Sequence, residues 1–400
     1  MACILIAGSV PFVAGAEVEP SRKIVVFKEG VSLGERDSAL GDLSHNRIKR
    51  LERALTADVV VGASNHELAR LSAHPAVLRI DEDVVVYALE RAPRPLISGE
   101  RFGSARRGGG GTQVALPQQL PWGIDRIDAE LVWPGGNSAN PIKVGIIDTG
   151  ISLSHPDLSS NIKGNINTIN SKKKGNDDNG HGSHVAGIVA ALNNTQGVVG
   201  GAPLADLYAI KVLGANGSGY LSDIIEGLDW AIARDLDVVN MSLGTSADVQ
   251  SFHDAIALVY HAGITIICAA GNNGGTVIYP AAYPEVIAVS ATDSSDTLAS
   301  WSSRGPEVDL AAPGVSIYST YKGTGYETLS GTSMASPHVT AAAALLLNRP
   351  VRVSEDTDGD GAWDPSEVAA HLQSTATDLG ALGTDIFYGA GLVNAFAALE

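Results

Sequence analysis

The sequence predicts an α/β fold in which helices flank a parallel β-sheet in three layers, preceded by a smaller α+β domain. Three observations predict this. At 400 residues the chain is long enough for two domains. Several strands are nearly continuous apolar runs, as expected when both faces of a sheet are buried. Helical segments lie between those runs, which is typical of parallel sheets. The expected strands are 142–147, 207–212, 238–241, 264–269 and 286–289, and the expected helices are 182–192, 221–234 and 249–261.

The smaller domain is predicted over residues 17–89. Short apolar strands interleave there with helical segments over about 70 residues, as in a ferredoxin-like α+β domain. We expect strands at 23–27, 58–61 and 84–87, a capped helix at 65–72, and a segment with charges at helical spacing at 44–54. Residues 90–116 then break the pattern with prolines, scattered arginines and four consecutive glycines, so we expect a flexible linker.

The first 16 residues are apolar and small, and they end in Ala14-Gly15-Ala16. This ending is typical of a signal-peptide cleavage site, so we expect a secreted protein. No later run reaches the roughly 18 apolar residues of a membrane span. Cys3 lies in the removed segment, which leaves Cys268 alone. No intramolecular disulfide is therefore expected, and Cys268 is interpreted as a small buried apolar residue.

Charge is distributed unevenly along the chain. The net charge of −17 divides into +1 for residues 17–116 and −18 for residues 117–400. Binding to nucleic acid needs a positive surface, so the acidity of residues 117–400 disfavours that class of function. An acidic domain instead suits a secreted protein with cation sites.

Three separate segments contain the residue types of a nucleophilic triad. Asp148 ends the first apolar strand. His181 and Ser333 each open a helix, within Asn179-Gly180-His181-Gly182-Ser183-His184 and Gly331-Thr332-Ser333-Met334-Ala335-Ser336-Pro337. A neutral hydroxyl is a weak nucleophile and needs an adjacent base. That base needs a carboxylate to fix its tautomer and stabilise its charged form.

Each residue also has an ordinary structural explanation. An Asp after a strand is usually a turn or cap residue. A His in a glycine-rich turn is usually structural, and a Ser before a helix is usually an N-cap. For any one of these residues alone, the structural explanation would be preferred to a catalytic role. The occurrence of all three together favours a triad.

These segments resemble those around the triad of the subtilisin family, in that family's order of Asp, His and Ser, and the resemblance covers residues 118–400. It implies a secreted endopeptidase with a subtilisin-like, seven-stranded parallel sheet, which hydrolyses peptide bonds through an acyl-enzyme. It also implies that His181, rather than His184, is the base.

Asn272 follows another apolar strand, within Ala269-Ala270-Gly271-Asn272. Its amide can donate to a developing oxyanion together with the backbone N–H of Ser333. Loss of such a donor costs roughly 2.7–4 kcal/mol of transition-state stabilisation. The structural alternative is an Asn in a turn, and the resemblance favours the catalytic role.

We expect an extended peptide substrate to add a strand to the enzyme. By resemblance, two backbone segments flank that strand, and a primary pocket receives the side chain before the scissile bond. The residues implied are Ser218, Gly219, Ser242, Leu243 and Gly244 for the segments, Leu221 for a more distal pocket, and Ala270, Gly271 and Ile278 for the primary pocket. Many relatives have a small residue where this chain has Ile278. We therefore hypothesise that Ile278 narrows the pocket and disfavours Phe, Tyr and Trp.

The segment 356–367 fits the twelve-residue EF-hand loop that binds Ca²⁺. The side-chain ligands expected at loop positions 1, 3, 5, 9 and 12 are Asp356, Asp358, Asp360, Asp364 and Glu367. Gly361 occupies position 6, and Ala362 would supply its carbonyl at position 7. A merely solvated acidic loop would explain the aspartates but not the placement of Gly361 and Glu367.

A further calcium site is implied by the resemblance alone. Side-chain oxygens would come from Gln118, Asp157 and Asn194, and backbone carbonyls from Leu192, Gln196 and Val198. A set of oxygen ligands suits Ca²⁺ rather than Zn²⁺.

Residues 17–89 resemble the family's propeptide, which implies a folding helper and intramolecular inhibitor. Parallel sheets fold slowly through non-local contacts, so a docked domain can serve as a template. Residues 80–89 resemble the propeptide's C-terminal tail, and we hypothesise cleavage after Leu89. Cleavage after Leu116 is less favoured, because Pro117 would follow. The pair Arg106-Arg107 could mark a second cut, but we interpret it as part of the linker.

Three functions compete at this stage. The favoured one is an active endopeptidase, expected to be a monomer, that acts on proteins and peptides. The second is a catalytically inactive, calcium-binding protein that kept the fold, and the complete set of Asp148, His181, Asn272 and Ser333 argues against it. The third is a metal hydrolase, but the chain has no H-E-x-x-H cluster.

Overall fold

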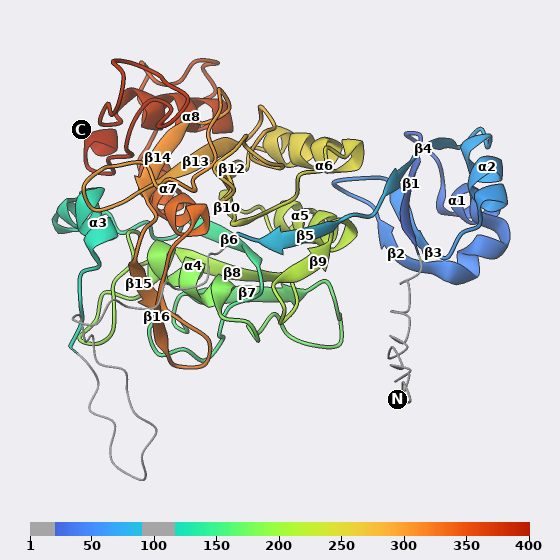
Figure 1. The fold of residues 1–400 in the computed structure, drawn as a ribbon, viewed down its shortest axis with the longest axis horizontal. Coiled ribbons are helices and arrows are strands. Elements are labelled where there is room, and N and C mark those ends of the chain that lie inside the picture. The colour runs from blue at the N-terminus through green and yellow to red at the C-terminus, as the bar shows by residue number, and fades with distance from the viewer. Residues whose placement is uncertain (1–20, 90–116) are drawn as a thin grey trace, which may run out of the picture.

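The computed structural model describes residues 21–89 and 117–400. A small N-terminal domain lies beside a larger domain, and one strand, β5, runs from the first onto the second (Figure 1). The expected signal peptide and linker fall outside the described residues, as does Arg106-Arg107. Among the described helices, none is long and apolar enough to cross a membrane.

The N-terminal domain has the βαββαβ order of a ferredoxin-like fold, with an antiparallel sheet in the order β2-β3-β1-β4. Serine N-caps with a glutamate three residues on begin both of its α-helices, at Ser32 and Ser64. The predicted small α+β domain is therefore confirmed. Its elements are β1 (Arg22–Phe27), α1 (Leu33–Leu40), η1 (Gly41–Asn46), β2 (Arg47–Leu51), β3 (Ala57–Val61), α2 (Asn65–Ser72) and β4 (Val77–Glu82).

Two expectations for this domain were wrong. The charges over 44–54 have helical spacing, but the strand β2 forms there. It pairs with β3, and its arginines contact a carboxylate of that strand. Arg50 Nε, for example, lies 3.3 Å from Asp58 Oδ1. The strand expected at 84–87 exists as β5 (Val85–Ala88), but it leaves this sheet. Its place at the sheet's edge is taken by β4, which alternates apolar and charged residues and was not predicted.

The larger domain is built on the predicted parallel sheet. Seven strands follow the order β14-β13-β12-β10-β6-β8-β7, and every neighbouring pair is parallel. They are β6 (Lys143–Asp148), β7 (Ile162–Asn167), β8 (Asp206–Lys211), β10 (Val238–Met241), β12 (Thr265–Ala269), β13 (Ile287–Thr292) and β14 (Leu310–Pro313). The two strands missed from sequence, β7 and β14, are the edge strands.

Helices cover both faces of this sheet and complete the three layers. Val144 and Ile146 of β6 pack in one core cluster with residues of α4 and α7, whereas Ile147 packs in a second cluster with residues of α5 and α6. The helices are α3 (Trp122–Arg126), η2 (Ala129–Leu131), η3 (Trp133–Gly135), α4 (His181–Ala190), α5 (Leu221–Ala233), α6 (Gln250–His261), α7 (Thr332–Leu347), α8 (Pro365–Ser374) and η4 (Ala397–Leu399). A hairpin of β15 (Ile317–Thr320) and β16 (Tyr326–Leu329) packs on α4.

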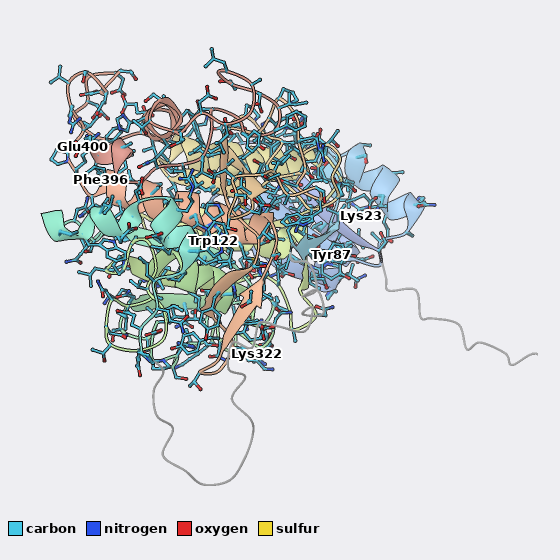
Figure 2. All side chains as sticks on the ribbon, turned by 60° about the vertical axis from the view of Figure 1, so that its left-hand side comes forward. Lys23, Tyr87, Trp122, Lys322, Phe396 and Glu400 are labelled. Atoms are coloured by element: carbon cyan, nitrogen blue, oxygen red, sulfur yellow. The ribbon has the colours of Figure 1, made fainter. Side chains whose placement is uncertain are left out.

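The two domains meet through a third sheet. β5 lies between β9 (Ser218–Tyr220) and β11 (Leu243–Gly244), antiparallel to both. Figure 2 labels Tyr87 of β5 close to the larger domain and Lys23 within the small domain. Two carboxylates of α5 in the larger domain add to the contact. Asp223 pairs with Lys49 of the small domain at 2.9 Å, and Asp229 accepts the backbone N–H groups of residues 52–54.

Candidate active site

Asp148 and His181 form a buried pair at the carboxyl end of the sheet. Asp148 is the last residue of β6, His181 is the first residue of α4, and both are fully buried. His181 Nδ1 lies 2.8 and 2.9 Å from the two carboxylate oxygens of Asp148. Because Nδ1 donates to the carboxylate, Nε2 is the ring atom left to exchange protons with a substrate group.

Glycines make this pair geometrically possible. Gly180 precedes α4 with a φ of +125°, and a Cβ there would lie 2.2 Å from the Tyr321 ring. A Cβ at Gly182 would lie 2.2 Å from the Gly150 carbonyl oxygen and 3.1 Å from Asp148 Oδ1. Gly180 is therefore required by the contact with Tyr321 and by its positive φ, and Gly182 by the close approach of α4 to the end of β6.

His184, the second histidine of the motif, has different surroundings. Its Nε2 donates toward the carbonyl oxygens of Ile317 and Glu327, both at 3.1 Å, and so ties α4 to the β15–β16 hairpin. Burial lowers the pKa of His184 to about 3. This ring stays neutral and binds backbone carbonyls of the hairpin, as expected for a structural histidine.

Ser333 is the second residue of α7, which packs against α4. Pro337 lies four residues on and has no N–H, so the Ser333 carbonyl lacks its ordinary helical donor. The buried Ser242 hydroxyl donates to that carbonyl instead, at 3.0 Å. The Ser333 hydroxyl in turn lies 3.1 Å from the Ser242 carbonyl oxygen. The hydroxyl of each serine therefore contacts the backbone carbonyl of the other.

Asn272 lies beyond the end of β12, and its amide is oriented by Thr332. The Asn272 Oδ1 atom accepts from both the backbone N–H and the hydroxyl of Thr332, each at 2.9 Å. Because both Thr332 groups donate hydrogen bonds, the acceptor atom Oδ1 of Asn272 must face Thr332. The Nδ2 atom therefore faces the opposite direction. That direction leads to the last described residue of the N-terminal segment, Leu89.

The carbonyl oxygen of Leu89 occupies the point where these groups converge. It accepts from the Ser333 hydroxyl at 2.6 Å and from Asn272 Nδ2 at 2.5 Å. Two side-chain donors thus hold the end of the N-terminal segment against Ser333 and Asn272. Leu89 is the residue after which the sequence predicted cleavage.

The residues leading to Leu89 form a strand between the two flanking segments, the position expected for a substrate. Backbone N–H groups of Ala88 and Leu89 donate to the carbonyls of Gly217 (2.9 Å) and Ser242 (3.1 Å). Across β5, Val86 faces Gly219, Tyr87 faces Ser218 and Gly244, and Ala88 faces Leu243. Leu221 is buried at the start of α5, in the same core cluster as Val86. The structure thus brings the predicted flanking segments together around one strand.

Ile278 lies between Gly244 of a flanking segment and Gly271 of the predicted primary pocket, here called the two walls of that pocket. A Cβ on Gly244 would lie 2.7 Å from Ile278 Cδ1, and one on Gly271 would lie 3.2 Å from Ile278 Cγ1. The backbone N–H of Ile278 donates to the Ala270 carbonyl at 3.1 Å, which fixes the segment against the second wall. The isoleucine therefore fills space that a glycine would leave open.

The calcium ligands implied by resemblance gather from three segments. The buried Asp157 carboxylate accepts from Asn194 Nδ2 (2.7 Å), the Val198 N–H (3.0 Å) and the Tyr326 hydroxyl (2.9 Å). Gln118 Nε2 donates to the carbonyls of Leu192 (2.8 Å) and Val198 (3.3 Å). Gln196 is adjacent, with its N–H on Asn194 Oδ1 at 2.7 Å. The donor set consists of carboxylate, carbonyl and amide oxygens, which fits Ca²⁺.

The EF-hand-like loop brings part of its predicted ligand set together. Asp356, Asp358 and Glu367 offer carboxylate oxygens within 4.8 Å of one another. Gly361 has a φ of +81°, as the sharp turn at position 6 requires. Asp364 instead caps α8, accepting the N–H groups of residues 366 and 367. Asp360 accepts the Ala362 N–H at 2.7 Å. The clustered carboxylates fit a Ca²⁺ ion.

Three residues that shape these sites were missed by sequence reasoning. Thr332 orients the Asn272 amide, Tyr326 donates to Asp157, and Ser222 binds the carboxylate of Asp83 at the start of α5. Each acts across a large separation in sequence. Thr332, adjacent to Ser333 in its motif, was the only one of the three with a local signal.

Known proteins resemble this chain over most of its length. Residues 139–391 match the model of the subtilase family. Subtilisin DY of Bacillus licheniformis is 46% identical over 288 residues, which is 71% of this chain and all of that protein. An alkaline protease of Shouchella clausii is 38% identical over 374 residues, covering 93% of this chain and 87% of that protein. Subtilisin Savinase of Lederbergia lenta is 44% identical over 282 residues, covering 70% and 99%. With this fold and this arrangement at the carboxyl end of its sheet, the chain belongs to the subtilase family and is a serine endopeptidase.

Proposed function

We propose that the protein is a secreted, calcium-stabilised endopeptidase that cleaves its own precursor after Leu89, with Asp148, His181 and Ser333 as its triad. The relatives, which match between 70% and 93% of the chain, are named as subtilisins and proteases. The observation that carries the proposal is the Leu89 carbonyl, held by the Ser333 hydroxyl and the Asn272 amide.

The proposed reaction follows from the positions of these groups. The Ser333 oxygen attacks the carbonyl carbon while its proton passes to His181 Nε2. Asp148 keeps Nδ1 protonated and stabilises the imidazolium that forms. The oxygen of the tetrahedral intermediate receives Asn272 Nδ2 and the Ser333 N–H. His181 then gives its proton to the leaving amine, and water hydrolyses the acyl-enzyme by the same steps.

The site of self-cleavage can be tested directly. Processed wild-type enzyme should begin at Glu90 when its N-terminus is sequenced, because Leu89 is the residue whose carbonyl lies at Ser333. A start at Pro117 or after Arg107 as the first product would contradict this assignment. Sequencing at successive times distinguishes the first cut from later trimming of residues 90–116.

Residues 17–89 are proposed to inhibit the enzyme until they are removed. Their tail fills the cleft as a strand, and Tyr87 faces both flanking segments. Beyond the cleft, basic side chains of the small domain meet carboxylates of α5 and α6. Lys49 contacts Asp223 at 2.9 Å, and Arg79 contacts Asp254 at 2.5 Å. This pairing follows the charge difference between the two parts of the sequence.

The primary pocket is proposed to favour aliphatic over aromatic side chains, because Ile278 lies between its walls. In Ile278→Gly, the ratio of kcat/KM for Phe over Leu before the scissile bond should rise by about tenfold or more, since a few methylene groups of pocket space change discrimination by that amount. Peptides Val-Tyr-Ala-Leu and Val-Tyr-Ala-Phe with a p-nitroanilide leaving group provide the measurement. Exposed Thr276→Ala is the matched control. An unchanged ratio in Ile278→Gly would remove Ile278 as a determinant.

Calcium is proposed to bind at the site formed by Gln118, Asp157, Asn194 and the 192–198 carbonyls, and at the 356–367 loop. The clustered carboxylates of the loop repel one another, and a bound cation would remove that repulsion. Binding to the folded state alone stabilises it, by about 2.7 kcal/mol when calcium is 100-fold above its Kd.

Chelation should therefore lower the thermal stability of the mature enzyme. We expect EGTA to reduce Tm by about 5–10 °C relative to a saturating calcium solution, given about 2–4 °C for each kcal/mol in a domain of this size. Glu367→Gln should retain only part of this calcium-dependent shift. Glu285→Gln, which removes a carboxylate paired with His253, should retain all of it. A Tm that does not respond to EGTA would contradict both sites.

A further inference from the structure

Lys211 is a buried lysine at the carboxyl end of the parallel sheet, one strand away from Asp148. It is the last residue of β8, and it lies opposite Asp148 in the pairing of β6 with β8 (Figure 1). The backbone N–H groups of residues 212 and 213 donate to the Asp148 carbonyl at 2.9 and 3.1 Å. Lysine is almost never fully buried unless it is paired, so the partners of Lys211 need an explanation.

Three acceptors surround the Lys211 ammonium group. Nζ donates to the backbone carbonyls of Thr149 at 2.7 Å and Leu213 at 2.9 Å, and to Asp178 Oδ1 at 2.7 Å. An ammonium group has three N–H donors and no acceptor, so these contacts use all of its hydrogen-bonding capacity. The set of partners fits the protonated form, and Lys211 therefore places a positive charge inside the domain.

The three partners belong to different segments of the site. Thr149 directly follows Asp148 at the end of β6. Asp178 lies three residues before His181, in the loop that leads into α4. Leu213 follows β8 and leads into the first of the segments that flank β5. One side chain thus joins the segments that carry two residues of the proposed triad and a wall of the proposed substrate cleft.

A second, neutral set of contacts joins the first two of these segments. The Thr149 hydroxyl donates to Asp177 Oδ1 at 2.9 Å and accepts the Gly182 N–H, also at 2.9 Å. Asp177 Oδ1 in turn accepts the Gly180 N–H at 2.9 Å. These contacts hold the start of α4 near β6 without Lys211. Removal of Lys211 is therefore expected to disturb the site rather than to unfold the domain.

The charge of Lys211 bears on the protonation of His181. Within residues 148–151, 176–182 and 211–214, the carboxylates are Asp148, Asp177 and Asp178, and Lys211 is the one lysine or arginine. A nearby cation disfavours the imidazolium, whereas nearby carboxylates favour it. Lys211 and Asp178 offset each other only in part, because their side chains are 5% and 56% exposed and water screens the exposed charge more strongly.

We propose that Lys211 is a positioning residue of the catalytic machinery. Its N–H groups hold the segment of Asp148 against the segment that leads to His181. Its charge helps to keep His181 neutral, which is the form that accepts a proton from Ser333. The inference rests on the proposed triad and goes beyond it, because Lys211 donates to residues outside the triad and acts through them.

The experiment compares Lys211→Met with wild type as processed, mature enzymes. Methionine keeps much of the side chain's length but has neither the charge nor the donors. Titration of active sites with phenylmethylsulfonyl fluoride makes kcat refer to folded enzyme. With Val-Tyr-Ala-Leu p-nitroanilide, kcat should fall about 10–100-fold and KM should change less than about twofold, because a small misplacement of catalytic groups has effects of that size.

The pH profile of Lys211→Met reports the charge separately from the position. Loss of the cation lets His181 take up a proton more readily, so the acid limb of kcat/KM should move to higher pH by about 0.5. A residue that merely supports the fold would not move this limb. Initial rates across the acid limb, at constant ionic strength, provide the measurement.

Asp178→Ala is a second variant, at a more exposed position. It removes the anion, while Lys211 keeps its two carbonyl partners, so kcat should fall less than in Lys211→Met. The acid limb should move in the opposite direction, to lower pH, because the remaining cation is then uncompensated. If both residues act through one contact, the double variant should lose no more kcat than Lys211→Met alone.

Lys143 is the matched control, because it lies at the opposite end of β6. Its Nζ also donates to backbone carbonyls, those of Arg234 at 3.3 Å and Asp235 at 3.1 Å. Lys143→Met should therefore retain the wild-type kcat and the wild-type acid limb.

The possible results separate this inference from the triad beneath it. A wild-type kcat for each titrated site in Lys211→Met would overturn the inference, and so would a loss of kcat with an unmoved acid limb. If Lys211→Met does not fold, Asp178→Ala decides: an acid limb that stays in place or moves to higher pH overturns the inference. Activity that persists in Ser333→Ala would instead contradict the proposed triad, whatever Lys211 does.

Discussion

Ser333→Ala is expected to lower kcat by about 10⁶-fold, the size known for loss of the nucleophile in a subtilisin, and to leave the precursor uncleaved. The substitution removes the oxygen that lies 2.6 Å from the Leu89 carbonyl oxygen. No other described hydroxyl takes its place there: the Ser242 hydroxyl donates to the Ser333 backbone carbonyl. Hydrolysis of a peptide p-nitroanilide and the mass of the purified chain provide the two measurements.

A nearby serine serves as the control for this experiment. Ser330 lies three residues earlier, and its hydroxyl oxygen accepts the Ser316 N–H at 2.8 Å. Ser330→Ala should process and hydrolyse peptides at close to the wild-type rate. Circular dichroism of Ser333→Ala should match that of the wild-type precursor. Normal processing of Ser333→Ala, in purified protein without another protease, would exclude Ser333 as the nucleophile.

The proposed active site was open to sequence reasoning because each residue of the proposed triad lies in a short contiguous motif. Local sequence accounts for part of the geometry: Gly182 is required by the close approach of α4 to the end of β6. Local sequence does not account for the orientation of Asn272, because Thr332 comes from a segment 60 residues away. Nor does it reveal Ser222, whose partner Asp83 is 139 residues away.

Secondary structure was predicted well where the local pattern and the tertiary environment agree. Buried central strands such as β6 and β10 are apolar throughout, so their pattern is unambiguous. The strand β2 was mistaken for a helical segment because its arginines and lysine have helical spacing, whereas pairing with β3 decides its conformation. The edge strand β7 carries polar residues at alternating positions and so gave no continuous apolar run.

The two proposed calcium sites show the same contrast. The 356–367 loop contains its whole ligand set in twelve consecutive residues, so spacing alone predicted it. The other set combines residues 118, 157 and 192–198, and only resemblance to a family could connect them. Tyr326, which donates to Asp157 at 2.9 Å from a fourth segment, could not have been inferred from spacing.

Asn272→Ala is expected to lower kcat by about 10²–10³-fold, the loss known for the corresponding donor in a subtilisin, with little change in KM. Asn272 Nδ2 lies 2.5 Å from the Leu89 carbonyl oxygen, so it already contacts the ground-state group. The contact strengthens as that oxygen acquires negative charge, and an interaction gained mainly in the transition state acts on kcat rather than on KM. Steady-state kinetics on one peptide p-nitroanilide separate the two constants.

The neighbouring Asn273 is the matched control for this substitution. Its Oδ1 accepts the Gly275 N–H at 2.7 Å and the Ser303 hydroxyl at 3.0 Å, so it supports the loop without contacting Leu89. Asn273→Ala should retain a kcat within a few-fold of wild type. If Asn272→Ala raised KM and left kcat unchanged, the amide would bind substrate and transition state equally, and its role as an oxyanion donor would be wrong.

Because Thr332 fixes the amide from the opposite side, Thr332→Val should also lower kcat, by freeing the Asn272 side chain to rotate.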